Sequence, residues 1–244
     1  MNDDMRGAWR TKAVEDFLKQ VYLLEQQIAP VPTTLLAEAL NIAAPSVTDM
    51  IKRLSGAADD KEKKEGKKPE AIPPQLLIYT PYQGVQLTDL GKRIALEMVR
   101  HHRLLELYLT QKLGYAWDEV HEEADRLEHH ISERLEARID DALGNPQIDP
   151  HGDPIPALDG TISTQTLILL SDMSLSRPCE VSRIIDQTPE VLRYFADLGL
   201  VIGVAVTLHE RAPLNDTLRI QIGGGDERVT ISTQVARKVL VICG

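Results

Sequence analysis

The chain has 244 residues, of which 43% are hydrophobic and 26% are charged, and this length and composition are typical of two or three globular domains. Its first residues are polar and acidic, and no apolar run approaches the roughly 20 residues of a membrane-spanning helix, so we expect a cytoplasmic protein with no signal peptide and no membrane contact. A net charge of −10 argues against nucleic-acid binding, but the first hundred residues hold as many basic as acidic residues, so this argument does not apply to them.

The front of the chain predicts three short helices. Apolar residues recur at helical spacing over residues 11–26, and two prolines then end the first helix. Thr33 begins a second helix over residues 33–40, and Pro45 opens a third over residues 45–54. Two short helices joined by a tight turn are typical of a helix-turn-helix motif.

The polar side of the third helix is the predicted DNA-reading surface. A lysine suits a phosphate group, and small hydroxyl groups reach either phosphates or base edges. The expected DNA contacts are Pro45, Ser46, Thr48 and Lys52.

A hairpin follows the third helix after a long, charged stretch. Residues 55–74 lack any periodicity and predict a flexible insertion, for which a solvated loop is favoured over a phosphate-binding arm. Two strand-like runs around Gly84 then predict a wing, and Thr88 begins another helix. Three helices followed by such a hairpin form a winged helix-turn-helix.

The rest of the chain changes from helices to strands. Helical periodicity runs from residue 90 to 112 and again from 117 to 143, and the Gly- and Pro-rich segment 144–156 then predicts a connector. Beyond residue 166, short strands and one helix predict a small β-barrel. Cys179 and Cys243 lack metal-site spacing, and we expect two reduced packing residues.

Histidines and carboxylates are concentrated in the middle of the chain, where five of the seven histidines lie between residues 101 and 130. On a helix, residues four, seven and eight apart share one face, and acid with imidazole on facing helices can enclose a divalent metal. The residues in question are His102 and Glu106 on one predicted helix, and His121, Asp125, Glu128 and His129 on the next. The alternative is a solvated acidic helix with chance histidines.

The residue types limit the choice of metal ion and argue against a catalytic function. Carboxylates and imidazoles without a thiolate suit Mn(II) or Fe(II), whereas structural zinc sites favour cysteine. The segment His121–Asp125 begins like a zinc-protease motif, but Asp125 replaces its second histidine. We therefore expect no enzyme, with a metal-dependent hydrolase as a minor alternative.

These motifs together resemble the diphtheria toxin repressor family of metal-dependent regulators, which includes manganese transport regulators, and the resemblance covers nearly the whole chain. It rests on EDFLKQVYLL, LAEALNIAAPSVTDMIKRL, YQGVQLTDLGKRIA, HRLLELYL, VHEEADRLEHHISE and GNPQIDPHGDPIP. The implied fold is mainly α with small β. It comprises a winged helix-turn-helix domain (1–91), a helical dimerisation and metal-binding domain with its connector (92–159), and an SH3-like (FeoA-like) β-barrel domain (160–244).

The resemblance also implies two metal sites. A regulatory site would use Asp16, Asp125, Glu128 and His129, and a second site would use His102, Glu106 and His121, with Glu190 as a further ligand from the SH3-like domain. Asp125 stands where iron-sensing members have Cys and manganese-sensing members have Glu. Asp16 matches the manganese-type ligand, and both are hard oxygen donors that favour Mn(II) over Fe(II). Lys19 stands where manganese-type members carry another acid, so two separated sites are preferred.

We therefore expect a homodimeric, Mn(II)- or Fe(II)-dependent repressor that binds a pseudo-palindromic double-stranded operator and controls metal-ion uptake genes. A different class of function stays open, namely a metal-buffering or metal-delivery protein whose helix-turn-helix serves only packing. Metal-dependent operator binding would distinguish the two.

Overall fold

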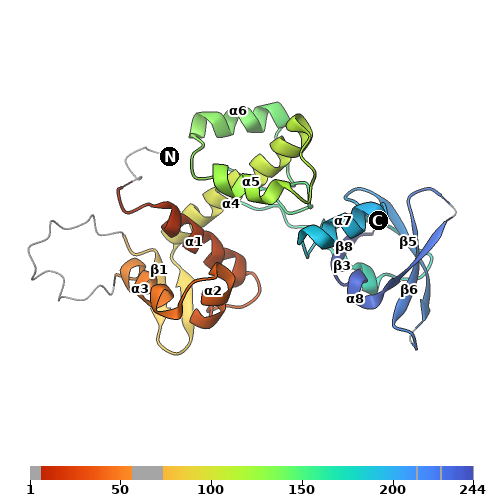
Figure 1. Ribbon diagram of the computed structural model, residues 1–244, viewed down its shortest axis with the longest axis horizontal. Coiled ribbons are helices and arrows are strands. Elements are labelled where there is room, and N and C mark those ends of the chain that lie inside the picture. Colours follow the sequence, from red (N-terminus) through yellow and green to blue (C-terminus); the bar gives the residue numbers. More distant parts are fainter. Residues whose placement is uncertain (1–6, 57–73, 213, 226, 244) are drawn as a thin grey trace, which may run out of the picture. The chain divides into compact units, whose positions relative to one another are not determined.

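The computed structural model describes residues 7–56, 74–212, 214–225 and 227–243 (Figure 1). The chain divides into two compact units. The first comprises Met1–Arg100 with Leu158–Gly160, and the second comprises His101–Ala157 with Thr161–Gly244. The predicted insertion at 55–74 lies almost entirely outside the described residues.

The first unit begins with three helices, α1 (Lys12–Glu25), α2 (Thr33–Leu40) and α3 (Ala44–Leu54). The apolar residues of α1 recur every three or four positions and are buried, as an amphipathic helix requires. On α3, Val47, Ile51 and Leu54 are buried and the opposite side is exposed. The turn between α2 and α3 contains Asn41 in the left-handed conformation, which asparagine tolerates at a helix end. The predicted helix-turn-helix is confirmed.

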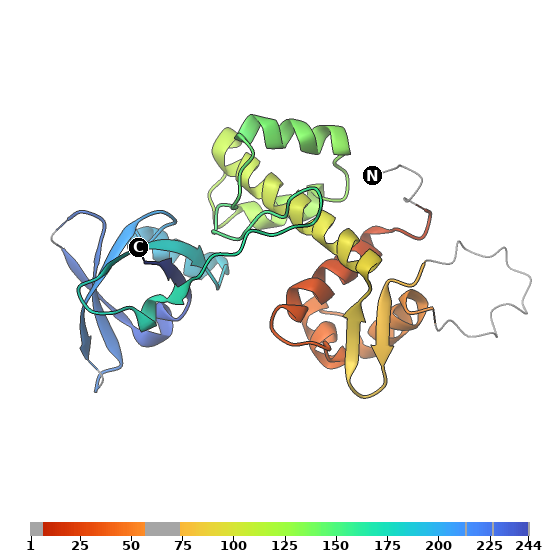
Figure 2. The same ribbon diagram turned by 180° about the vertical axis from the view of Figure 1, so that it is seen from behind.

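Strands β1 (Leu77–Thr80) and β2 (Gly84–Leu87) form an antiparallel hairpin after α3 (Figure 2). Val31, just before α2, exchanges both backbone hydrogen bonds with Val85 at 2.8 and 2.9 Å. Gly84 makes this close approach possible, since an added Cβ would collide with the Val31 carbonyl. The hairpin is therefore tied to the helices at the position expected of a wing.

Three helices follow the wing: α4 (Asp89–Leu113), α5 (Val120–Leu127) and α6 (Glu133–Leu143). The periodicity of residues 117–143 predicts one helical stretch, but the structure breaks it after α5. Ser132 begins α6 as its N-cap and accepts a hydrogen bond from the Leu135 amide at 3.2 Å. None of the helices in the described ranges is both long and apolar enough to cross a membrane.

The predicted connector is an ordered turn at residues 148–154 of the second unit. The side chain of Asp149 accepts hydrogen bonds from the amides of His151 and Asp153 at 2.8 and 2.9 Å. Gly152 has a φ of +88°, and a Cβ there would collide with the Ser182 carbonyl. The turn therefore packs directly against the backbone at Ser182. This close approach requires glycine, which has no Cβ, at position 152.

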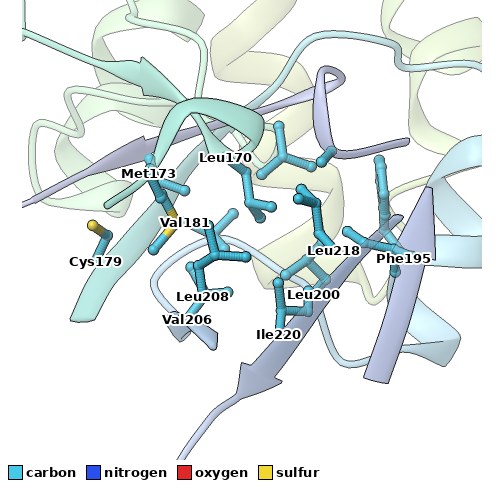
Figure 3. Close-up of a cluster of buried hydrophobic side chains, with 14 of the residues drawn as sticks. Leu170, Met173, Cys179, Val181, Phe195, Leu200, Val206, Leu208, Leu218 and Ile220 are labelled. Atoms are coloured by element: carbon cyan, nitrogen blue, oxygen red, sulfur yellow. The ribbon is translucent and has the colours of Figure 1, made fainter. Parts of the chain in front are cut away.

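The remainder of the second unit is a six-stranded sheet with the order β3-β8-β4-β5-β6-β7. Its elements are β3 (Ile168–Leu169), the short helix η3 (Leu170–Asp172), β4 (Pro178–Ile184), α7 (Pro189–Asp197), β5 (Ala205–Ala212), β6 (Thr217–Ile222), β7 (Arg228–Ser232), α8 (Thr233–Ala236) and β8 (Val239–Ile242). Figure 3 shows the apolar core that these elements enclose. The SH3-like fold is confirmed, although no pairing between β3 and β7 closes a barrel among the described strands.

Cys179 and Cys243 form a disulfide, so the expectation of two reduced cysteines is wrong. The reason is strand register. Glu180 on β4 lies opposite Ile242 on β8, and the cysteines are the next opposing pair in the same antiparallel ladder. Their Cα atoms are 4.3 Å apart although they are 64 positions apart in the sequence, and spacing along the chain gave no sign of this.

Candidate metal centre and nucleic-acid interface

His102 lies at the middle of the candidate metal centre. Its Nε2 atom is 2.9 Å from Glu106 Oε1, one turn further along α4, and 3.0 Å from Nδ1 of His121 on α5. Its Nδ1 atom is 2.6 Å from Glu128 Oε2 and 3.2 Å from Asp125 Oδ1. His102, a member of the predicted second site, therefore also contacts two members of the predicted regulatory site, Asp125 and Glu128.

Helix α5 supplies the facing acids and imidazole. His121 and Asp125 are one turn apart, and Glu128 continues the same face directly after the helix ends at Leu127. His121 Nδ1 is also 3.1 Å from Glu106 Oε1. The structure thus brings together the ligand atoms of two overlapping triads, and within each triad these atoms lie within 4.8 Å of one another: His102, Glu106 and His121, and His102, Asp125 and Glu128.

Three further predicted ligands lie in different surroundings. His129 follows the end of α5, and its Nε2 is 3.4 Å from Glu128 Oε1. Asp16 lies on α1 in the first unit, and its part in the site stays a prediction. Glu190, in the first turn of α7, is exposed and lies 3.7 Å from Arg193, and the structure does not bring it into any cluster of possible ligands among the described residues.

Asp149 and His151 of the connector complete a cluster that the sequence interpretation missed. With Glu106 they form a fully buried triad whose ligand atoms lie within 4.8 Å of one another. His151 Nε2 donates a 2.7 Å hydrogen bond to the Trp117 carbonyl, and its ring stacks on the Trp117 indole. The sequence does place a histidine and acids in this segment, but its glycines and prolines predicted only a connector.

The charges in this buried cluster perturb one another. Burial disfavours ionisation of Glu106, but His102 and the other imidazoles hold the pKa of this carboxyl well below its usual range. Burial, reinforced by the carboxylates of Asp153 and Glu106, raises the pKa of Asp149 to about 7. Burial opposes a charge on His151, yet Glu106 and Asp149 raise its pKa to about 9.

This donor set fits a divalent cation. Within the described residues, His151 Nδ1 is buried and has no hydrogen-bond partner, and it lies 3.7 Å from Glu106 Oε2. An imidazole nitrogen and a carboxylate oxygen that face each other at this distance can share either a proton or a divalent ion. The cysteines are bonded to each other, so the available ligands are oxygen and nitrogen.

The candidate nucleic-acid interface is the exposed side of α3. All four predicted contacts, Pro45, Ser46, Thr48 and Lys52, are exposed there. The Thr48 hydroxyl donates to the Ala44 carbonyl at 3.0 Å, so its remaining lone pairs can only accept a further bond. Lys52 and Arg53 lie in the last turn. The helix therefore presents small polar groups, two cations and the carboxylate of Asp49.

Three sequence-family profiles match successive parts of the chain. The iron dependent repressor N-terminal DNA binding domain matches residues 11–58. The iron dependent repressor metal binding and dimerisation domain matches residues 88–157, and the FeoA domain matches residues 168–243. The second match contains the triads, and the first contains α3.

The chain is similar to two bacterial regulators. The chain is 28% identical over 239 residues to the iron-dependent repressor IdeR of Mycobacterium leprae, covering 93% of this chain and 95% of that protein. It is 30% identical over 133 residues to the HTH-type transcriptional regulator MntR of Geobacillus thermodenitrificans, covering 54% and 82%.

A solved structure described as a manganese-dependent transcriptional repressor in complex with manganese is 35% identical to the chain. It superposes with a TM-score of 0.76 and covers 94% of this chain and 99% of its own.

Proposed function

Because the chain belongs to the iron-dependent repressor family, which consists of transcriptional repressors and not enzymes, we propose that it represses metal-ion uptake genes when Mn(II) or Fe(II) is bound. The observation that carries this proposal is the convergence of α4, α5 and the connector on one group of carboxylates and imidazoles, in which all members but His121 and Asp125 are buried.

The ligand chemistry favours Mn(II) over Fe(II). Asp125, Glu128 and Glu106 offer hard oxygen atoms, and no thiolate is present. We assign Asp16, Asp125, Glu128 and His129 to a regulatory centre. The second centre uses His102, Glu106 and His121 together with Asp149 and His151, and Glu190 stays a predicted further ligand.

The same proposal gives each part of the chain a role. Residues 1–91 read DNA, residues 92–159 dimerise and bind metal, and residues 160–244 form the SH3-like domain. A homodimer presents two α3 helices to one pseudo-palindromic operator, and the protein acts in the cytoplasm where that operator lies. A divalent ion would offset the repulsion among the clustered carboxylates.

Footprinting on genomic DNA with and without Mn(II) tests this function. We expect protection only with metal, and binding that weakens steeply with salt because phosphate contacts release counterions. Ser46→Glu on α3 should abolish protection without changing Mn(II) affinity, since it places a carboxylate beside the phosphates. Ser163→Glu, the same change at an exposed position in neither helix nor strand, is the matched control and should bind as the parent does.

The remaining alternative is a metal-buffering or metal-delivery protein. It predicts tight Mn(II) binding with no metal-dependent protection at any genomic site and no effect of Ser46→Glu. That pattern would overturn the repressor proposal while leaving the metal centre in place.

A further inference from the structure

A buried histidine next to the metal centre has no place among its ligands. His101 precedes His102 on α4, is 2% exposed, and belongs to none of the ligand clusters formed by the described residues. Neighbouring residues of a helix point about 100° apart, so the two rings face different sides of α4. The His102 ring faces the ligand cluster, whereas the His101 ring faces the end of α5 and the first turn of α6.

Both ring nitrogens of His101 are already used. Nδ1 is 3.1 Å from the backbone carbonyl of Glu128, and because a carbonyl only accepts, the imidazole is the donor. Nε2 is 3.2 Å from Oε2 of Glu136, a buried acid in the first turn of α6. His101 therefore joins α4 to the end of α5 and to α6.

The Glu128 carbonyl needs a hydrogen-bond donor from outside helix α5. Glu128 is the C-cap of α5, and the last carbonyls of a helix have no partner within it. A histidine donor there satisfies the carbonyl. The side chain of the same Glu128 reaches His102 at 2.6 Å. Consecutive residues of α4 thus hold Glu128 at both its backbone and its carboxylate.

We propose that His101 is a positioning residue of the metal centre: it fixes the backbone of Glu128, and with it the carboxylate of Glu128 and the following His129, in the place where they can bind a divalent ion. This inference rests on the proposed function. Partners that orient metal ligands commonly change metal affinity by roughly 10- to 100-fold when removed.

Two substitutions separate the two contacts of His101. His101→Asn keeps an N–H donor near the Nδ1 position and hence the bond to the Glu128 carbonyl. His101→Gln carries its donor to the Nε2 position, so it keeps the contact with Glu136 and loses the contact with Glu128. The pair tests whether the carbonyl bond, rather than burial of a histidine, supports the centre.

The measurements are Mn(II) affinity and the electron paramagnetic resonance line shape of bound Mn(II), with urea unfolding of the metal-free protein as the stability reference. We expect His101→Asn to keep the parent line shape and an affinity within about threefold. His101→Gln should lose roughly 10- to 100-fold in affinity and change the line shape. Loss of affinity in both variants in proportion to their loss of stability, or in neither variant, would overturn the assignment.

If His101→Gln does not fold, His101→Ala, which also removes the donor to the Glu128 carbonyl, takes its place: an altered line shape beside a parental His101→Asn supports the proposal, and a parental line shape in His101→Ala overturns it. The parent protein separates this inference from the proposed function. A parent that binds no Mn(II) refutes the metal-dependent repressor, whereas a parent that binds Mn(II) beside an unaffected His101→Gln refutes only the role of His101.

Discussion

His151 Nδ1 faces Glu106 Oε2 across 3.7 Å in the buried interior of the second unit. The Trp117 carbonyl fixes the opposite nitrogen as a donor, so Nδ1 is the atom left to bind either a proton or a metal. Since the carboxylates around it raise the pKa of His151 to about 9, the metal-free protein holds a proton there at neutral pH.

Metal binding should therefore release protons. Below a pH of about 9 the ion must displace the His151 proton, and below about 7 it must also displace one from Asp149. We expect Mn(II) affinity to fall as the pH is lowered through these values. Calorimetry at pH 7.5 in two buffers of different ionisation enthalpy measures the number of protons released. Because the charge of His151 lowers the pKa of Asp149, the comparison uses an Asp149→Asn background. There His151→Gln should release about one proton fewer, and an unchanged number would exclude His151 as a ligand.

Gly152 should be required for the connector. Alanine there combines a left-handed φ with a collision against the Ser182 carbonyl, and we expect a loss of about 1–3 kcal/mol in the free energy of unfolding together with weaker Mn(II) binding at the second centre. Gly114→Ala is the control, because its φ is +75° but nothing lies within 4 Å of its added Cβ. Equal losses in the two variants would show that backbone strain alone, without the collision, is responsible.

Replacing Asp125 by cysteine should change metal preference. A soft thiolate in place of a carboxylate favours Fe(II), Co(II) and Ni(II) over Mn(II), while the neighbouring Glu128 and His102 remain. Competition titrations with the four metals measure the ranking. Asp125→Asn, which lacks a thiolate, controls for loss of charge. An unchanged ranking in Asp125→Cys would remove Asp125 from the ligands.

Asp16 should matter more for the coupling between metal binding and operator binding than for the total amount of metal bound. It lies on α1, more than a hundred residues before Asp125, so an ion bound by both would connect the DNA-reading part of the chain with the metal-binding part. We expect Asp16→Ala to dimerise and to bind metal at the second centre, but to lose most of its metal-dependent operator affinity. Operator binding in Mn(II) equal to that of the parent would contradict this role.

The spacing of apolar and polar residues predicted most features that lie within a single helix. The exposed face of α3 follows from apolar spacing within a few turns, and so does the shared face of His121, Asp125 and Glu128. The break before α6 was harder to see, because the periodicity of residues 117–143 continues through it and only the cap at Ser132 marks it.

Contacts between distant segments could not be predicted in this way. His151 reaches Glu106 through a turn built on Asp149 and Gly152, and nothing in the spacing of these residues specifies that approach. The contact by which His101 on α4 supports Glu128 could not be predicted for the same reason. His101 and His102 are adjacent and chemically identical in the sequence, and only the packing of α5 and α6 distinguishes them.

The Cys179–Cys243 bond also determines how the sheet responds to mechanical force. Because it joins β4 to the end of β8, tension applied outside the two cysteines passes through the covalent bond and leaves the strands between them unloaded. The enclosed segment spans 64 positions, and at about 3.4 Å per residue it hides roughly 200 Å of extensible chain. In a single-molecule pulling experiment, that length should appear only after a reducing agent has opened the bond.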